Sequence, residues 1–225
     1  MDSTTCICEI DLIKPLTDKI ILLLLQPSGT RFQYIAGQYI EIITADGQHM
    51  PFSIANAPLG SKQLELHIRH TTENTYSNYL LNEIKRTGKI KIRGPFGHCI
   101  YHPNTPKTTL LMAGGTGFAP IKAIIEQVLA EGDNTPKHLY WGAKNMSDLY
   151  LDELPRQWQK TVPHFRYTPV LPETGLIYEI IAQDYPSLTN HQVYAAGPPD
   201  MIFSALENFQ KLGLEKKFMY SDAII

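Results

Sequence analysis

The sequence predicts two domains, an N-terminal antiparallel β-barrel followed by an α/β domain built on a parallel sheet. The chain has 225 residues, which exceeds the usual size of a single domain. Its first half contains short β-rich segments between turn residues, whereas its second half alternates strands with helices. A polar stretch with two prolines, from His102 to Lys107, separates the two patterns. We therefore expect domains at 1–103 and 104–225.

Six segments of the first half have the composition of strands. Apolar and polar residues alternate strictly over 64–69, which assigns one face to a core and the other to solvent or a ligand. A helix is expected to start near Thr75 and to carry Tyr79, Leu80 and Ile84 toward the strands. Six such strands predict an antiparallel barrel that closes on itself. The strands are expected at 6–13, 20–26, 38–43, 52–55, 63–69 and 89–93.

The second half follows the pattern of a parallel sheet covered by helices. The segment 109–113 is almost continuously apolar, which is typical of a strand buried on both faces. In such a sheet the ligand crevice lies at the carboxyl ends of the strands. Further strands are expected at 138–141, 165–171, 192–196 and 218–220. Helices are expected at 120–131, at 148–160 with an interruption near Pro155, at 176–183 and at 201–212.

Composition and charge argue against several classes of protein. The formal charge of −2 gives no basic face for phosphates, so nucleic acid is not an expected partner. The longest apolar run, 20–25, is too short to span a bilayer, and the polar amino terminus lacks the basic region of a signal peptide. We expect a cytoplasmic protein without a membrane partner. The three cysteines and eight histidines show no ligand spacing, so no metal site is expected.

A glycine-rich turn at 114–120, with the sequence GGTGFAP, follows the apolar strand and precedes a helix. Glycines allow a tight turn and let phosphate oxygens approach backbone amides, while the helix amino terminus supplies a positive dipole. This context predicts that Gly114, Gly115, Thr116 and Gly117 hold a pyrophosphate. Pro120 stands where the usual fingerprint has its third glycine, and a purely structural turn is the alternative.

Five motifs together resemble the ferredoxin–NADP reductase superfamily, and more narrowly its NAD(P)H:flavin reductases and CDP-6-deoxyglucoseen reductase-like members, without their iron–sulfur domain. The resemblance extends over essentially the whole chain. It implies a six-stranded flavin-binding β-barrel and a Rossmann-like five-stranded parallel sheet with flanking helices. The motifs are PFSIAN at 51–56, GPFG at 94–97, GGTGFAP at 114–120, LYWG at 139–142 and AGPPDM at 196–201.

The resemblance also implies roles for individual residues. Ser53 is expected at N5 of the flavin and Thr116 between flavin and nicotinamide, so both are candidate catalytic residues. Pro51 and Phe52 are expected to frame the flavin ring, and Lys144 to meet the adenosine ribose or its phosphate. Solvent-facing strand, helix-cap and turn roles remain the alternatives for the rest. The remaining cofactor-binding candidates are His67, Ile68, Arg69, Asn74, Tyr76 and Ser77 for flavin, and Gly197, Pro198 and Pro199 for nicotinamide.

The chain departs from the family pattern at several positions. Met50 stands where an arginine clamps a flavin phosphate, and Phe52 replaces a tyrosine. We therefore expect weaker flavin retention, with His49 or Arg69 as alternative phosphate partners. Ala196 replaces a cysteine, as in reductases that use flavin as a passing substrate. The sequence also ends without the terminal aromatic residue that covers flavin in many relatives, which suits exchange.

These residues predict an NAD(P)H-dependent flavin oxidoreductase that transfers hydride from nicotinamide C4 to flavin N5. The flavin is expected to be FAD, or FMN or riboflavin as an exchangeable substrate, and the donor NADH or NADPH. Because Lys144 is a single basic residue beside Asp148, use of both nucleotides is expected. One alternative keeps FAD bound and delivers electrons to a separate ferredoxin or oxygenase. An alternative of another class is a non-catalytic flavin-binding regulatory subunit.

Overall fold

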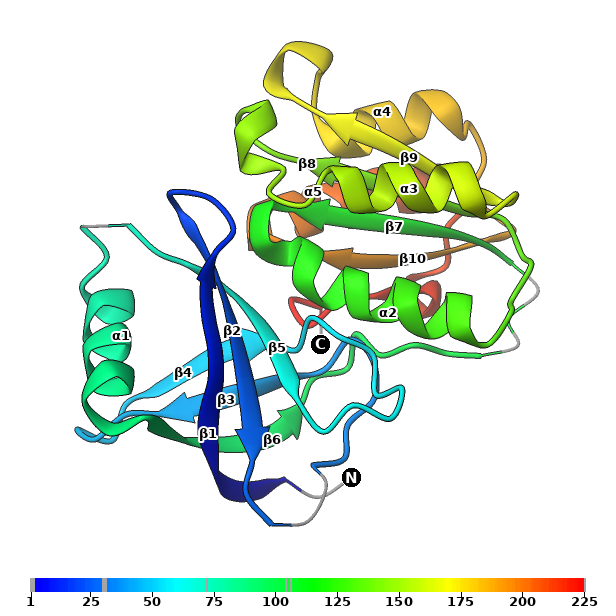
Figure 1. Cartoon of the computed structure of the whole chain (residues 1–225). Coiled ribbons are helices and arrows are strands. Elements are labelled where there is room, and N and C mark those ends of the chain that lie inside the picture. The colour runs from blue at the N-terminus through cyan, green and yellow to red at the C-terminus, as the bar shows by residue number, and fades with distance from the viewer. Residues whose placement is uncertain (1–2, 30–31, 72, 104, 106, 225) are drawn as a thin grey trace.

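The computed structural model describes residues 3–29, 32–71, 73–103, 105 and 107–224. They form two sheets, one from each half of the chain, that lie side by side (Figure 1). Two residues of the expected domain boundary, Asn104 and Pro106, and the terminal Ile225 lie outside the described residues. The six-stranded antiparallel sheet and the five-stranded parallel sheet with helices are confirmed.

The first sheet has the strand order β4-β3-β6-β1-β2-β5. Its edge strands, β4 and β5, share no ladder; among the described residues they meet through a single bridge between Ile54 and Leu66, beside which the Ala55 amide donates to the Glu65 carbonyl at 2.7 Å. The expectation of a closed barrel is therefore corrected to a curved sheet joined at one point. The strands are β1 (Thr4–Pro15), β2 (Ile20–Pro27), β3 (Tyr39–Ile43), β4 (His49–Ser53), β5 (Leu64–Arg69) and β6 (Lys89–Phe96).

Helix α1 (Thr75–Thr87) covers the end of this sheet that is remote from the parallel sheet (Figure 1). It buries Leu80 and Ile84 against the strands, as expected. Tyr79, which was expected to face the same way, is instead 43% exposed. The reason is helical geometry, since Tyr79 precedes Leu80 by roughly 100° of rotation and leaves the buried stripe.

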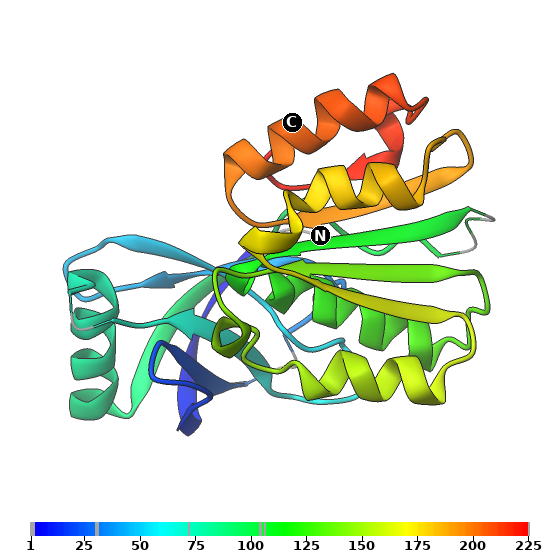
Figure 2. The same cartoon turned by 90° about the horizontal axis from the view of Figure 1, so that it is seen from above.

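The second sheet is parallel and has the order β11-β10-β7-β8-β9. Figure 2 shows α2 and α3 on one face and α4 and α5 on the other. The helix expected at 148–160 begins only at Glu153, so that Pro155 lies in its first turn, where a missing N–H costs no hydrogen bond. The elements are β7 (Thr108–Gly114), α2 (Phe118–Ala130), β8 (Lys137–Gly142), α3 (Glu153–Thr161), β9 (Phe165–Val170), α4 (Ile177–Asp184), β10 (His191–Ala196), α5 (Pro199–Lys211) and β11 (Met219–Tyr220).

An apolar cluster joins the two sheets. Ile20 and Cys99 from the first half pack in one continuous core with Ile121 and Ile124 of α2. Helix α2 therefore lies between its own sheet and the strands of the first sheet (Figure 1). This packing fixes the amino end of α2 relative to the first sheet.

None of the helices in the described ranges is long and apolar enough to cross a bilayer. In the same ranges, no three His, Cys, Asp or Glu side chains are grouped so as to hold a metal ion. Cys6, Cys8 and Cys99 are free thiols.

Candidate functional site

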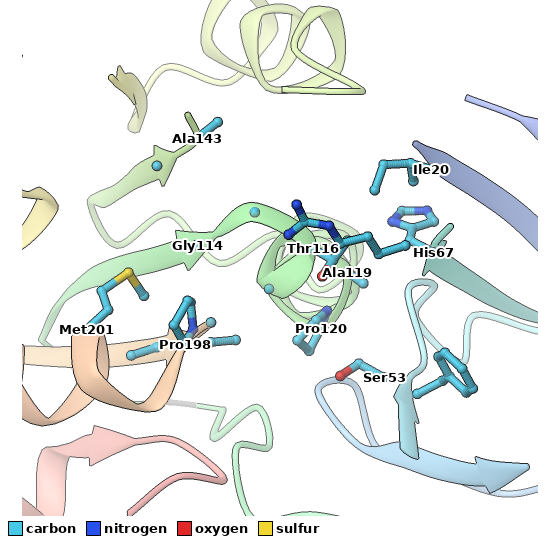
Figure 3. A pocket seen from close by; sticks show the side chains of 18 of the residues that line it. Ile20, Ser53, His67, Gly114, Thr116, Ala119, Pro120, Ala143, Pro198 and Met201 are labelled. Atoms are coloured by element: carbon cyan, nitrogen blue, oxygen red, sulfur yellow. The ribbon is translucent and has the colours of Figure 1, made fainter. Parts of the chain in front are cut away.

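A pocket of about 770 Å³ opens between the two sheets, at the carboxyl ends of β7, β8 and β10 (Figure 3). This is the place where parallel sheets with helices on both faces bind ligands. Both halves of the chain contribute to it, so a ligand bound by the first half and a ligand bound by the second half can meet within one cavity. The sequence-predicted residues that line it are Pro51, Phe52, Ser53, His67, Arg69, Asn74, Gly114, Gly115, Thr116, Gly117, Lys144, Gly197 and Pro198.

The glycine-rich turn is held rigidly at the end of β7. Gly115 has a φ of 55°, and the space beside its Cα is open. A Cβ at Gly117 would overlap the carbonyl of Ala196, so only glycine lets the turn pack on β10. The indole N–H of Trp141 donates to the Gly115 carbonyl at 2.9 Å. The turn thus presents open backbone and the amino end of α2 to the pocket, a geometry that suits an anionic group.

Ser53 and Thr116 line the pocket from opposite sheets (Figure 3). Ser53 is the last residue of β4, and Thr116 lies in the turn before α2. Both are half-buried, and neither hydroxyl has a hydrogen-bond partner within the described part of the chain. Both hydroxyls are therefore available to a ligand.

His67 also lines the pocket, but its ring nitrogens are already bound by the protein. Its side chain is fully buried, with Nε2 2.7 Å from Glu65 Oε1 and Nδ1 2.9 Å from the Tyr150 hydroxyl. Burial, reinforced by the charge of Glu65, holds the pKa of Tyr150 well above its ordinary value. The phenol therefore keeps its proton, and both ring nitrogens of His67 are occupied by protein partners.

Several expected flavin and nicotinamide residues lie outside the pocket lining. Ile68 packs in the core of the first sheet, and Tyr76 is 61% exposed on α1. Ser77 is buried, and Asn74, which does line the pocket, caps α1 by accepting a hydrogen bond from the Ser77 amide at 3.1 Å. Pro199 is exposed at the start of α5. Asn74 and Ser77 thus form the cap of α1, and the expected cofactor contacts of these five residues stay predictions.

The position of the missing arginine does not line the pocket. Met50 packs against the barrel core, and His49 pairs with Glu41 at 2.8 Å. Arg69 and Lys144 both line the pocket with exposed side chains. His49 and Arg69 are the two alternative phosphate partners, and of these only Arg69 lines the cavity.

The pocket wall includes charged residues that sequence reasoning missed. Lys19 in the turn before β2 pairs with Asp148 at 3.4 Å, so an ion pair joins the two halves at the pocket. Asp222 Oδ1 accepts hydrogen bonds from the amides of His98 and Cys99 and brings the carboxyl-terminal segment into the wall. The partners are more than 120 residues apart in sequence, so no local pattern could have identified them.

Comparisons with known proteins agree with this geometry. A family model described as an oxidoreductase FAD-binding domain matches residues 16–101, and one described as an oxidoreductase NAD-binding domain matches residues 111–206. CDP-6-deoxy-L-threo-D-glycero-4-hexulose-3-dehydrase reductase of Yersinia pestis is 35% identical over 97% of this chain and 68% of its own length. A probable flavin reductase of Vibrio harveyi is 33% identical over 96% of this chain and 98% of its own.

A solved structure shares the fold. The cytochrome P450 reductase GcoB of Amycolatopsis superposes with a TM-score of 0.89 at 23% identity, over 98% of this chain and 69% of that one. The two matched family models fall on the two sheets described above. The resemblance expected from the five motifs is confirmed, and the chain belongs to the FAD- and NAD-binding oxidoreductases of the ferredoxin reductase family.

Proposed function

We propose that the chain moves hydride from NADH or NADPH to a flavin held in the pocket between the sheets. The observation that carries this proposal is that one cavity is lined both by Ser53 of the first sheet and by the Gly114–Gly117 turn of the second sheet. When bound, the nicotinamide supplies hydride from C4 and the flavin accepts it at N5. The protein contributes by holding the reacting atoms about 3 to 3.5 Å apart.

Each half of the chain has its own task in this proposal, with the domains divided at 1–103 and 104–225. The Ser53 hydroxyl hydrogen-bonds the flavin, and Pro51 and Phe52 exclude water from its ring. The backbone of the glycine-rich turn holds the pyrophosphate of the nucleotide. Thr116 separates the two ligands, and Gly197 and Pro198 form the floor below the nicotinamide.

Two relatives favour two fates for the electrons. The Vibrio relative is named a flavin reductase, which supports flavin as an exchangeable substrate. The Yersinia relative is named as the reductase of a dehydrase, which supports the second candidate, a flavin-retaining chain that passes electrons to a separate protein such as a ferredoxin or an oxygenase.

The absorbance spectrum of the purified chain, before and after gel filtration, separates these candidates. We expect the yellow colour to be lost on the column, and NADH and NADPH to be oxidised once riboflavin, FMN or FAD is added. Colour that survives the column would favour the flavin-retaining reductase. No oxidation of either nucleotide with any flavin would contradict both and leave a non-catalytic regulatory subunit.

A further inference from the structure

We propose that Lys122 is a positioning residue for the hydride transfer, because it ties the chain segment that follows Ser53 to the helix that follows Thr116. This inference rests on the proposed function and adds a residue outside the pocket lining to it. The ammonium group sits at the junction of the two halves, with a side chain only 7% exposed.

The contacts of Lys122 connect α2 with the first sheet. Its Nζ donates to the Ala55 carbonyl at 3.0 Å and lies 3.3 Å from Glu65 Oε1 of β5. It also pairs with Glu126, one turn further along α2, at 2.6 Å. Ala55 is two residues beyond Ser53, so this hydrogen bond acts directly on the strand end that presents the hydroxyl.

Glu126 completes the attachment from the same helix. Its Oε2 accepts a hydrogen bond from the Ala57 amide at 3.0 Å. The segment 55–57 is thus held at two points, a carbonyl by Lys122 and an amide by Glu126. Helix α2 begins at Phe118, directly after the turn that carries Thr116. One rigid helix therefore connects the nucleotide turn with the segment that follows Ser53.

The cluster pairs one ammonium group with two carboxylates and extends toward the pocket. Burial would raise the pKa of Glu65, but the hydrogen bond from His67 and the charges of Lys122 and His67 outweigh it, so the carboxyl pKa is lowered. Glu65 therefore stays ionised opposite the ammonium group. His67 and Tyr150, which line the pocket, form the end of the same network.

Hydride transfer depends steeply on the distance between the reacting atoms. Lys122→Met keeps an unbranched side chain up to Cε and removes the ammonium group. We expect it to lower the rate of hydride transfer at saturating ligands by about tenfold or more. Because Lys122 does not line the pocket, the dissociation constants of NADH and FMN should stay within about twofold of wild type.

The test is an anaerobic single-turnover measurement with NADH, NADH deuterated at C4, and FMN. Lys137→Met is the matched control, since Lys137 is 3% exposed and pairs with Asp133, four residues away, at 3.2 Å within the second half. The control should keep the wild-type transfer rate. Lys122→Arg, which keeps the cation, should recover part of the loss, and Lys122→Met should show a larger isotope effect on turnover.

A Lys122→Met variant that folds and transfers hydride at the wild-type rate would overturn the inference while leaving the proposed function intact. If that variant fails to fold, Glu126→Ala takes its place, because it removes both the acceptor of the Ala57 amide and the ion-pair partner of Lys122. An unchanged rate in Glu126→Ala would then count against the inference. A wild-type chain that does not oxidise NADH or NADPH contradicts the proposed function itself.

Discussion

Polar side chains around the pocket fall into two groups according to their hydrogen bonds. His67 and Asn74 are already bound by protein groups, the first by Glu65 and Tyr150 and the second by the Ser77 amide. Ser53, Thr116 and Arg69 line the cavity with polar atoms that remain available. Ser53 and Thr116 are half-buried, and a polar group withdrawn from water without a partner is costly, so these two hydroxyls are expected to meet ligands.

The hydroxyl of Ser53 is expected to contribute to hydride transfer and not to nucleotide binding. Ser53→Ala should lower the transfer rate by about tenfold or more, equivalent to about 1.4 kcal/mol of transition-state stabilisation. The dissociation constant of NADH should change much less, since the glycine-rich turn is untouched. Ser53→Thr keeps the hydroxyl and serves as the control. A wild-type transfer rate for Ser53→Ala in single turnover would remove this residue from the mechanism.

Arg69 is expected to take the place of the missing phosphate anchor. Because the Arg69 side chain is exposed, its contact with a phosphate should contribute about 1 kcal/mol. Arg69→Gln should therefore weaken the binding of FMN and FAD by several-fold to roughly tenfold at low salt. Riboflavin, which has no phosphate, should bind as before. Arg93, exposed on β6 and outside the pocket lining, gives the control variant Arg93→Gln. Fluorescence titration measures all three flavins, and equal losses for all would show that Arg69 does not face phosphate.

At the scale of elements, strict alternation and continuous apolar runs both predicted strands well. The alternation over 64–69 and the apolar run over 109–113 both became strands within a residue or two of their expected bounds. The strand expected at 52–55 is instead His49–Ser53 and contains Pro51. A proline argues against a central strand, yet β4 lies at an edge of its sheet, where a missing N–H breaks no ladder. Edge position is a property of the whole sheet and could not be obtained from this segment.

His138 makes strand β8 sensitive to acid. Burial lowers the pKa of His138 to about 4, against the opposing effect of Asp184. Between about 6.5 and 4 the unfolded chain therefore binds this proton and the folded chain does not, so stability falls as the pH decreases. His138→Asn should make the melting temperature less dependent on pH in this window. Parallel curves for the variant and the wild-type chain would show that this ring does not contribute.

At the scale of the whole molecule, the two halves meet through contacts between residues far apart in sequence. The five motifs predicted both sheets and the order of the ligand-binding segments. They could not predict that Lys122 meets Glu65, or that Lys19 meets Asp148, because these pairs form only when the two sheets pack together. The placement of α2 against both sheets is what creates a single cavity.

A single cavity has a kinetic consequence. If Ser53 and the glycine-rich turn each hold their own ligand, flavin and nucleotide must be bound together before hydride can move, since transfer needs the reacting atoms about 3 to 3.5 Å apart. Initial rates measured while NADH and FMN are both varied should therefore give intersecting double-reciprocal lines. ADP-ribose, which carries the pyrophosphate without nicotinamide, should compete with NADH but not with FMN. Parallel lines would instead indicate that the flavin stays bound while donor and acceptor alternate, and competition of ADP-ribose with FMN would show that the two ligands do not occupy separate halves of the cavity.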